Sequence, residues 1–590
     1  MLDGDHAPGP LDARNGLRTG GLLLLICGVA AVFRFTGLSW GAPYFHFHID
    51  EHFVFAGADM LRRSLREASL SAKFFMYGPL PMWMLDGVMA VRDRFFDPLV
   101  LTLKSDQITY MVIGRTTSAA LGTACVPLTY LIARRVGGRV AGLIASLLLA
   151  CAVVHLRESH FFTVDMAMLV FSMIAWFFAL RIAESGHWRD YVLAGVSVGA
   201  AVASKYSATF LVFVLALAHL CAPGRPTRLA DARGWIAWSL RGVMPLAVAV
   251  VVFVLVDPMA ILYYSKFRSD IPDWIVGPQS GTWKPIYILQ FADVRVPLYW
   301  FTNLLWWGLG PAFEIVGLLG VVWLLVRHDR PSLIAASFPI AYYAGAVQGI
   351  APVIRYALPL AAGLAVPAGV LCAYLLGRPR LRSAAMAITI VVCGTTALYA
   401  AAYMNVFRSP DSRLAASAWL LQYVRPDSTV LVEPSQNIPP MGSYLTQLDF
   451  RGDYVLWRNA QKHDYYHLYS IDTYQYLYDR RTTDDARRSY IQSRLALADW
   501  IVMDDTFLQF YQHLPENEYG VVKQYYRDLF AERLGFHLVQ TFKVYPSLFG
   551  RTINDDDAEL TFRLFDHPRV FVFARSGLAP QFAPDREAAR

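Results

Sequence analysis

Two adjacent carboxylates, Asp50 and Glu51, follow the first long apolar run of the sequence and are the first candidates for chemistry. A carboxylate close to the end of a membrane span could deprotonate an acceptor hydroxyl as a general base. The same residues also suit the first turn of a helix, which we expect over Phe53–Leu65. His46, His48 and His52 alternate with Asp50, so these four side chains would share one face of an extended strand. A divalent metal site is therefore a further possibility, although the spacing matches no recognised zinc pattern.

A second acidic candidate, Asp165, lies where the third predicted span passes into the fourth, five residues after His160. Asp165 could cap the fourth helix, because short carboxylates are favoured at helix N-termini. Ionisable groups at the edge of a span are costly, which makes them functional candidates. The functional interpretation places Asp165 opposite Asp50 across one cavity.

Two cations stand alone among apolar residues, each followed by a tyrosine: Lys205-Tyr206 and Arg355-Tyr356. Either cation could simply extend its charged end to the membrane interface. Arginine also suits phosphate, because its planar fork donates two parallel hydrogen bonds. Together, acidic groups and isolated cations at one membrane edge favour transfer of a sugar from a lipid phosphate.

Composition separates the chain into a membrane domain, 1–404, and a soluble domain, 405–590, which we call the tail. The chain is 55% hydrophobic and 17% charged, against about 25% charged in soluble proteins. A span needs about 20 apolar residues, and the runs indicate about eleven spans in a polytopic α-helical protein. They lie near 21–38, 108–134, 139–156, 165–183, 190–204, 206–223, 241–259, 302–326, 332–350, 353–376 and 382–404.

The arginines of the short loops predict the orientation. They cluster in alternate loops, as cytoplasmic loops require, which places the N-terminus in the cytoplasm of a cell inner or plasma membrane. An odd number of spans then puts the tail outside the cytoplasm, with long outer loops at 39–107 and 260–298. The net charge of +7 is accounted for by these loops, so it does not indicate a nucleic-acid partner.

The tail alternates helical and strand-like segments, which predicts a small α/β domain. Leu414–Tyr423 reads as a helix before the strand Thr429–Val432, and Arg488–Ala498 as a helix before Trp500–Met503. All six cysteines lie in apolar runs of the membrane domain, so we expect no disulfide in the tail. We expect the tail to serve as a lid or as a docking module for the acceptor.

The chain resembles GT-C glycosyltransferases of the branch that contains protein O-mannosyltransferases and the lipid A aminoarabinose transferase. Short motifs in order carry the resemblance: Asp50-Glu51, Tyr77-Gly78-Pro79-Leu80, His160…Asp165, Ser204-Lys205-Tyr206 and Arg355-Tyr356-Ala357-Leu358-Pro359. Two tail segments, Ala416-Ser417-Ala418-Trp419-Leu420 and Asp566-His567-Pro568-Arg569-Val570, are similar to recurrent segments of large prokaryotic members.

The resemblance implies an inverting transferase that moves a monosaccharide from a polyprenyl-phosphate donor in the bilayer to an extracytoplasmic hydroxyl. Asp50 would be the base, and Glu51 would orient it or share its role. Asp165, with His160, Tyr206, Tyr356 and Tyr77, would bind substrate, while Lys205 and Arg355 would bind the phosphate and stabilise its developing charge. No cofactor is implied, and a metal is not required.

Other functions stay open from the sequence alone. A lipid-linked sugar flippase or transporter would explain the spans, but not the long first loop or the tail, and we find no inverted repeat. A receptor or assembly scaffold would place the function in the tail. A transferase or ligase using a lipid-pyrophosphate oligosaccharide is the alternative among enzymes. The acceptor could be a protein, a lipid or a cell-envelope glycan.

Overall fold

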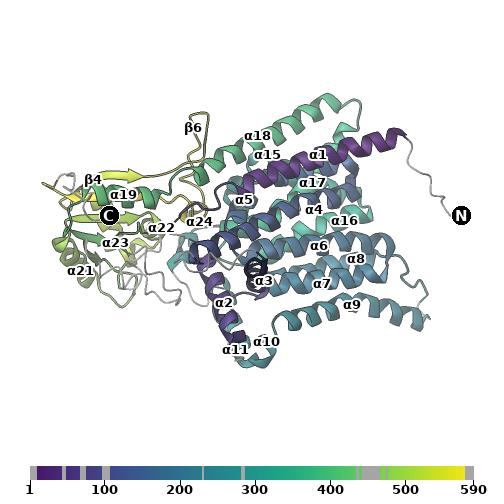
Figure 1. Cartoon of the computed structure of the whole chain (residues 1–590), viewed down its shortest axis with the longest axis horizontal. Helices are drawn as coiled ribbons and strands as arrows, with labels where there is room; N and C mark the ends of the chain where they lie inside the picture. Colours follow the sequence, from purple (N-terminus) through teal and green to yellow (C-terminus); the bar gives the residue numbers. More distant parts are fainter. Residues whose placement is uncertain are drawn as a thin grey trace.

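The computed structural model describes residues 10–42, 48–66, 75–95, 106–228, 231–280, 286–433, 438–441, 466–473 and 476–578. A bundle of long helices forms the membrane domain, and the tail packs against one end of it (Figure 1). We call that end of the bundle the tail-side end.

Among the described residues, six helices are long and apolar enough to cross a membrane, or up to seven if one pair bent by 120° counts as a single span. This confirms an integral membrane protein. Their main helices are α1 (Pro10–Phe35), α4 (Asp106–Ala150), α6 (Val164–Ser185), α9 (Ala232–Val256), α17 (Leu358–Leu376) and α18 (Arg382–Arg408). The bent pair joins Val296–Leu309 to α15 (Pro311–Arg327).

The predicted count of about eleven spans stays a prediction, for two physical reasons. The runs 108–134 and 139–156 are continuous in α4, which is interrupted only at Gly138 (φ 83°), where glycine tolerates a backbone that other residues avoid. Several other predicted spans are short helices. They are α7 (Trp188–Ser204), α8 (Leu211–Cys221), α15 and α16 (Arg330–Ala346).

Between the long helices, shorter elements gather at the tail-side end. The first loop contains α2 (Ile49–Arg66) and α3 (Leu80–Phe95), and α5 (Val153–His160) connects α4 to α6. Two 3-10 turns, η1 (Tyr206–Phe210) and η5 (Ile354–Ala357), precede α8 and α17. The second loop is a chain of short turns: α10 (Met259–Leu262), α11 (Tyr264–Asp270), η2 (Ile271–Val276), α12 (Gly277–Ser280), η3 (Ile286–Phe291), α13 (Val296–Tyr299), η4 (Trp300–Leu305) and α14 (Trp306–Leu309).

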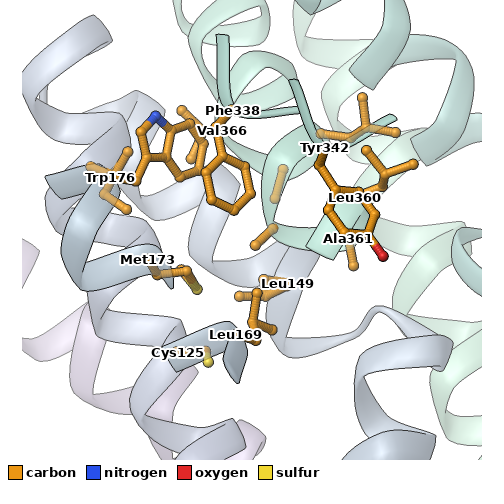
Figure 2. Close-up of a cluster of buried hydrophobic side chains, with 14 of the residues drawn as sticks. Cys125, Leu149, Leu169, Met173, Trp176, Phe338, Tyr342, Leu360, Ala361 and Val366 are labelled. Carbon is orange, nitrogen blue, oxygen red and sulfur yellow. The ribbon is translucent and has the colours of Figure 1, made fainter. Parts of the chain in front are cut away.

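Interlocked large side chains hold the centre of the bundle together (Figure 2). Trp176 of α6 stacks on Phe338 of α16 with ring centroids 4.4 Å apart and planes 14° apart. The indole N–H of Trp176 donates to the carbonyl of Ile334 at 3.1 Å. Because lipid is as apolar as these side chains, close packing rather than transfer from water stabilises the contact.

In the described part of the tail, five strands form a sheet in the order β2-β1-β3-β7-β4, which confirms the predicted α/β domain. Its strands are β1 (Thr429–Val432), β2 (His467–Ser470), β3 (Trp500–Asp504), β4 (Phe536–Phe542) and β7 (Val570–Arg575). β1 runs parallel to β2 and β3, whereas β7 is antiparallel to β3 and β4. A hairpin joins β5 (Ser547–Leu548) to β6 (Arg551–Thr552).

Helices cover both faces of this sheet. They are α19 (Ser412–Tyr423), α21 (Asp484–Leu497), α22 (Thr506–Gln512), α23 (Glu516–Phe530) and α24 (Leu560–Leu564). Leu431 and Ile501 enter one buried cluster, while their neighbours Val430 and Val502 enter another. This alternation follows the two-residue period of strands.

Replacing Trp176 with alanine should destabilise the protein, because it leaves a cavity beside Phe338 and removes one hydrogen bond. Large-to-small changes of this kind cost about 3–5 kcal/mol. Thermal unfolding in detergent should show a clear fall in Tm. Trp188→Ala is the matched control, since Trp188 is 55% exposed. Equal shifts in the two variants would contradict this account of the packing.

Candidate active site

A cavity of about 1310 Å³ opens at the tail-side end of the bundle, and both the membrane domain and the tail contribute to its wall. One part is polar, with Asp50, Tyr77, Lys205 and Arg355 in its lining. The other part is apolar and lies along α8 and α16, where its lining includes Phe213, Leu217, Leu333, Ile340 and Ala341. From the tail, Thr506, Phe507, Phe510, Thr561, Leu564 and Phe565 complete the wall.

Asp50 is the acidic group of the polar part. His48 Nδ1 lies 3.9 Å from Asp50 Oδ2, and two hydrogen-bond donors hold the carboxylate. The hydroxyl of Tyr77 donates to Asp50 Oδ1 at 2.5 Å, and the guanidinium of Arg355 pairs with Asp50 Oδ2. Gly78, next to Tyr77, packs so closely on the backbone at Ala203 that a Cβ there would collide with the carbonyl oxygen. Glycine thus lets Tyr77 approach the end of α7, where Lys205 follows.

A second ion pair lies nearby and contains the other predicted acid and cation. Lys205 Nζ donates to Asp165 Oδ1 at 2.6 Å. Asp165 is in the first turn of α6 and is buried, whereas Lys205 lines the cavity. Lys205 Nζ lies 5.0 Å from the centroid of the Tyr356 ring, and Arg355 Cζ lies 5.6 Å from the same centroid. Both cations therefore contact one tyrosine, and Tyr206 lines the same cavity.

Glu51 points into different surroundings from Asp50. Both oxygens accept from Arg115, at 2.9 Å from Nε and 2.8 Å from Nη2, and Oε1 also accepts from the backbone N–H of Phe162 at 3.0 Å. Glu51 is completely buried. Because its oxygens already accept these hydrogen bonds, Glu51 links α2 to α4 and to the segment before α6. These contacts suit a structural role better than a share in the base role that we predicted.

The histidines also differ from the prediction. His46 lies outside the described residues, and Asp50 and His52 lie in the helix α2 rather than in an extended strand. Side chains two positions apart in a helix point in different directions, so the expected common face does not form. Among the described residues, no group of three or more His, Cys, Asp or Glu side chains could hold a metal.

His160 lies against α1 and α18 and away from the described cavity lining. Its ring nitrogens are 2.8 Å from the Leu156 carbonyl and 2.9 Å from the Thr36 carbonyl. The ring stacks on Phe407 at 3.9 Å between centroids. These contacts do not fit the predicted substrate-binding role and make His160 part of the packing.

The structure adds a polar centre that the sequence did not single out, built on Arg157 of α5. Arg157 is buried, lines the cavity, pairs with Glu158, and donates from Nε to Asp566 Oδ2 in the tail at 3.0 Å. Asp566 also accepts from the Tyr403 hydroxyl at 2.6 Å. His567 lies 2.8 Å from both Asp566 and Asp555.

Signals for these missed residues were present in the sequence. Arg115 lies inside the run 108–134, where a charge is costly and requires a partner. Arg157 and Glu158 directly precede the segment that contains His160 and Asp165. Sequence order gives no indication, however, that Asp566 lies beside Arg157.

Residues 99–261 match the family model described as dolichyl-phosphate-mannose-protein mannosyltransferase. Among solved structures, the apo oligosaccharyltransferase of Archaeoglobus fulgidus matches with TM-score 0.50 and 12% identity, over 91% of this chain and 75% of that chain. The predicted resemblance to GT-C membrane glycosyltransferases is confirmed.

Two further solved structures are similar to this chain at lower scores. ArnT from Cupriavidus metallidurans, bound to undecaprenyl phosphate, matches with TM-score 0.45 and 14% identity, over 95% of this chain and 99% of that chain. The Saccharomyces cerevisiae Pmt1-Pmt2 complex, bound to its sugar donor, matches with TM-score 0.33 and 19% identity, over 42% of this chain and 34% of that chain. A search of curated proteins gives no significant match.

The Asp566–His567–Asp555 centre should make tail stability depend on pH. Burial alone would lower the pKa of His567, but the two carboxylates raise it to about 9. Burial would raise the pKa of Asp566, but Arg157 and His567 lower it to about 2. The contribution of His567 is therefore complete below its ordinary pKa of 6.5 and is lost as the pH rises toward 9.

Thermal unfolding of the full chain in detergent should consequently show a lower Tm at pH 9 than at pH 6. His567→Gln should be less stable at pH 6 and should lose most of this difference. An equally large fall in Tm from pH 6 to pH 9 in the variant would show that another group is responsible.

Proposed function

We propose that the protein transfers a monosaccharide from a polyprenyl-phosphate-linked donor to an extracytoplasmic acceptor hydroxyl, with inversion at the anomeric carbon. One observation carries the proposal: a single cavity joins a carboxylate and two cations to an apolar groove along α8 and α16. A lipid phosphate has the matching chemistry, because it combines an anionic head with a long hydrocarbon chain.

The donor phosphate would lie between Lys205 and Arg355, which both line the cavity. Its hydrocarbon chain would follow Phe213, Leu217 and Ile340. The match of residues 99–261 to a family described by a dolichyl-phosphate sugar donor supports this choice of substrate. Arg355 pairs with Asp50, so an incoming phosphate would compete for Arg355.

That competition would free Asp50 to act as the base. Asp50 takes the proton of the acceptor hydroxyl, and the acceptor oxygen forms a bond to the anomeric carbon. The bond from the anomeric carbon to the phosphate oxygen breaks, and its electron pair leaves with the polyprenyl phosphate. Lys205 and Arg355 stabilise the negative charge on this leaving group. The two cations supply this stabilisation without requiring a metal.

The proposal also specifies the membrane surface at which the sugar is transferred. The arginines between apolar runs support a cytoplasmic N-terminus, and hence a tail outside the cytoplasm. The polar part of the cavity lies at the tail-side end, so the sugar would be transferred at the extracytoplasmic surface. A protein, a lipid or a cell-envelope glycan could supply the acceptor hydroxyl.

Asp50→Asn should abolish transfer while the protein stays folded. Loss of a general base lowers kcat by about 10²–10⁴-fold, and the amide retains the size of the side chain. The assay uses purified protein with polyprenyl-phosphate sugars. Asp190→Asn is the control, because Asp190 is buried and paired with Arg181 at 2.7 Å but does not appear in the cavity lining. Normal turnover by Asp50→Asn would contradict the assignment of the base.

Lys205→Ala and Arg355→Ala should weaken binding of polyprenyl phosphate. A hydrogen bond between charged groups contributes about 1.5–3 kcal/mol, so each loss should raise Kd about tenfold or more. Binding to the detergent-solubilised protein measures this directly. Lys266→Ala is the control, because Lys266 pairs with Asp270 and is not among the lining residues. Unchanged affinity in both cavity variants would contradict the phosphate site.

A further inference from the structure

The tail segment 559–566, which includes α24, reaches the membrane domain beside the functional residues. We propose that this segment is a positioning element of the active site, in which Glu559, Phe565 and Asp566 set the geometry of the Asp50–Arg355 pair. The inference rests on the proposed function and extends it, because it assigns the tail a role in the transfer step itself.

Glu559 holds the turn that carries Arg355. Glu559 is 2% exposed, and its Oε2 accepts from the backbone N–H of Ile354 at 2.9 Å. Ile354 begins η5 and directly precedes Arg355. Asn303 of η4 fixes Glu559 in turn, since its Oδ1 accepts from the Glu559 backbone N–H at 2.8 Å. The position of Arg355 therefore depends on a buried carboxylate of the tail.

Phe565 packs on His48 and thereby helps to position Asp50, the other member of the ion pair. The ring of His48 lies between Phe565, with centroids 4.2 Å apart, and Phe161, with centroids 4.7 Å apart. His48 is 1% exposed and lies immediately before α2, two residues from Asp50. The two rings restrict the backbone that leads into Asp50.

Asp566 contacts α5 through Arg157, and α5 leads to the residues that pack on His48 and Glu51. The Arg157 guanidinium donates to Asp566 at 3.0 Å and to the Thr561 carbonyl at 2.6 Å. Arg157 belongs to α5, whose C-terminal end leads into Phe161 and Phe162. Phe161 is one of the two rings on His48, and the N–H of Phe162 donates to Glu51. The tail thus holds both partners of the Asp50–Arg355 pair, which come from distant parts of the chain.

Glu559→Gln tests the proposal in the full chain, because it keeps the side-chain length and removes one accepting oxygen. We expect kcat for sugar transfer to fall about tenfold and hydrogen–deuterium exchange of the Ile354 amide to become about tenfold faster. Ser412→Ala is the matched control. It removes a buried tail hydrogen bond, from Ser412 to the Pro568 carbonyl at 2.6 Å, that does not involve η5, α5 or His48. Its kcat and Ile354 exchange should stay near wild type.

A double-mutant cycle with Arg355→Lys separates positioning from general stability. If Glu559 acts through Arg355, Glu559→Gln should lower kcat little further in the Arg355→Lys background. A full additional fall in that background would overturn the proposal, as would wild-type kcat and exchange in Glu559→Gln. If the wild-type protein transfers no sugar, the proposed function fails. Exchange of the Ile354 amide in Glu559→Gln then tests whether Glu559 positions η5. An exchange rate equal to that of the wild type would overturn the positioning proposal.

Discussion

The ion pair between Asp50 and Arg355 joins positions 305 residues apart, and in our account the first loop and the tail position these two side chains. Tyr77 holds Asp50 from the first loop, and Tyr356 contacts the guanidinium of Arg355. A base paired with a cation is protected until something else binds that cation. In our account a lipid phosphate does so, which couples donor binding to release of the base.

The cost of burying a charge explains why the ionisable side chains around the site form ion pairs. An unpaired ion at membrane depth is expensive, whereas removing one partner of a buried pair leaves the other uncompensated. Glu51 with Arg115, Asp165 with Lys205, and Arg157 with Asp566 each satisfy this constraint. The first and third pairs tie elements together. The second also presents its cation to the cavity, where a substrate can reach it.

The sequence predicts features that depend on local pattern and misses those that depend on distant contacts. Apolar runs and the helix–strand alternation of the tail predict the membrane bundle and the α/β domain, because period and composition act locally. Asp50, Lys205 and Arg355 were singled out because isolated ionisable groups at span edges are costly, and Tyr77 because of the family resemblance. The structure brings these four side chains to one cavity, and their roles stay predictions. The partner of Glu51 could not be predicted, since adjacency to Asp50 says nothing about Arg115 on α4. The expected role of the tail as a lid or docking module stays a prediction. The buried contacts of Glu559 with η5 and of Asp566 with α5 depend on distant parts of the chain and could not be predicted.

The most direct test of the central claim is an experimental structure of the protein with a polyprenyl phosphate bound. Our account predicts the phosphate between Lys205 and Arg355, the hydrocarbon chain along α8 and α16, and Arg355 turned away from Asp50. A phosphate bound elsewhere, or an Asp50–Arg355 pair unchanged beside the bound lipid, would contradict it.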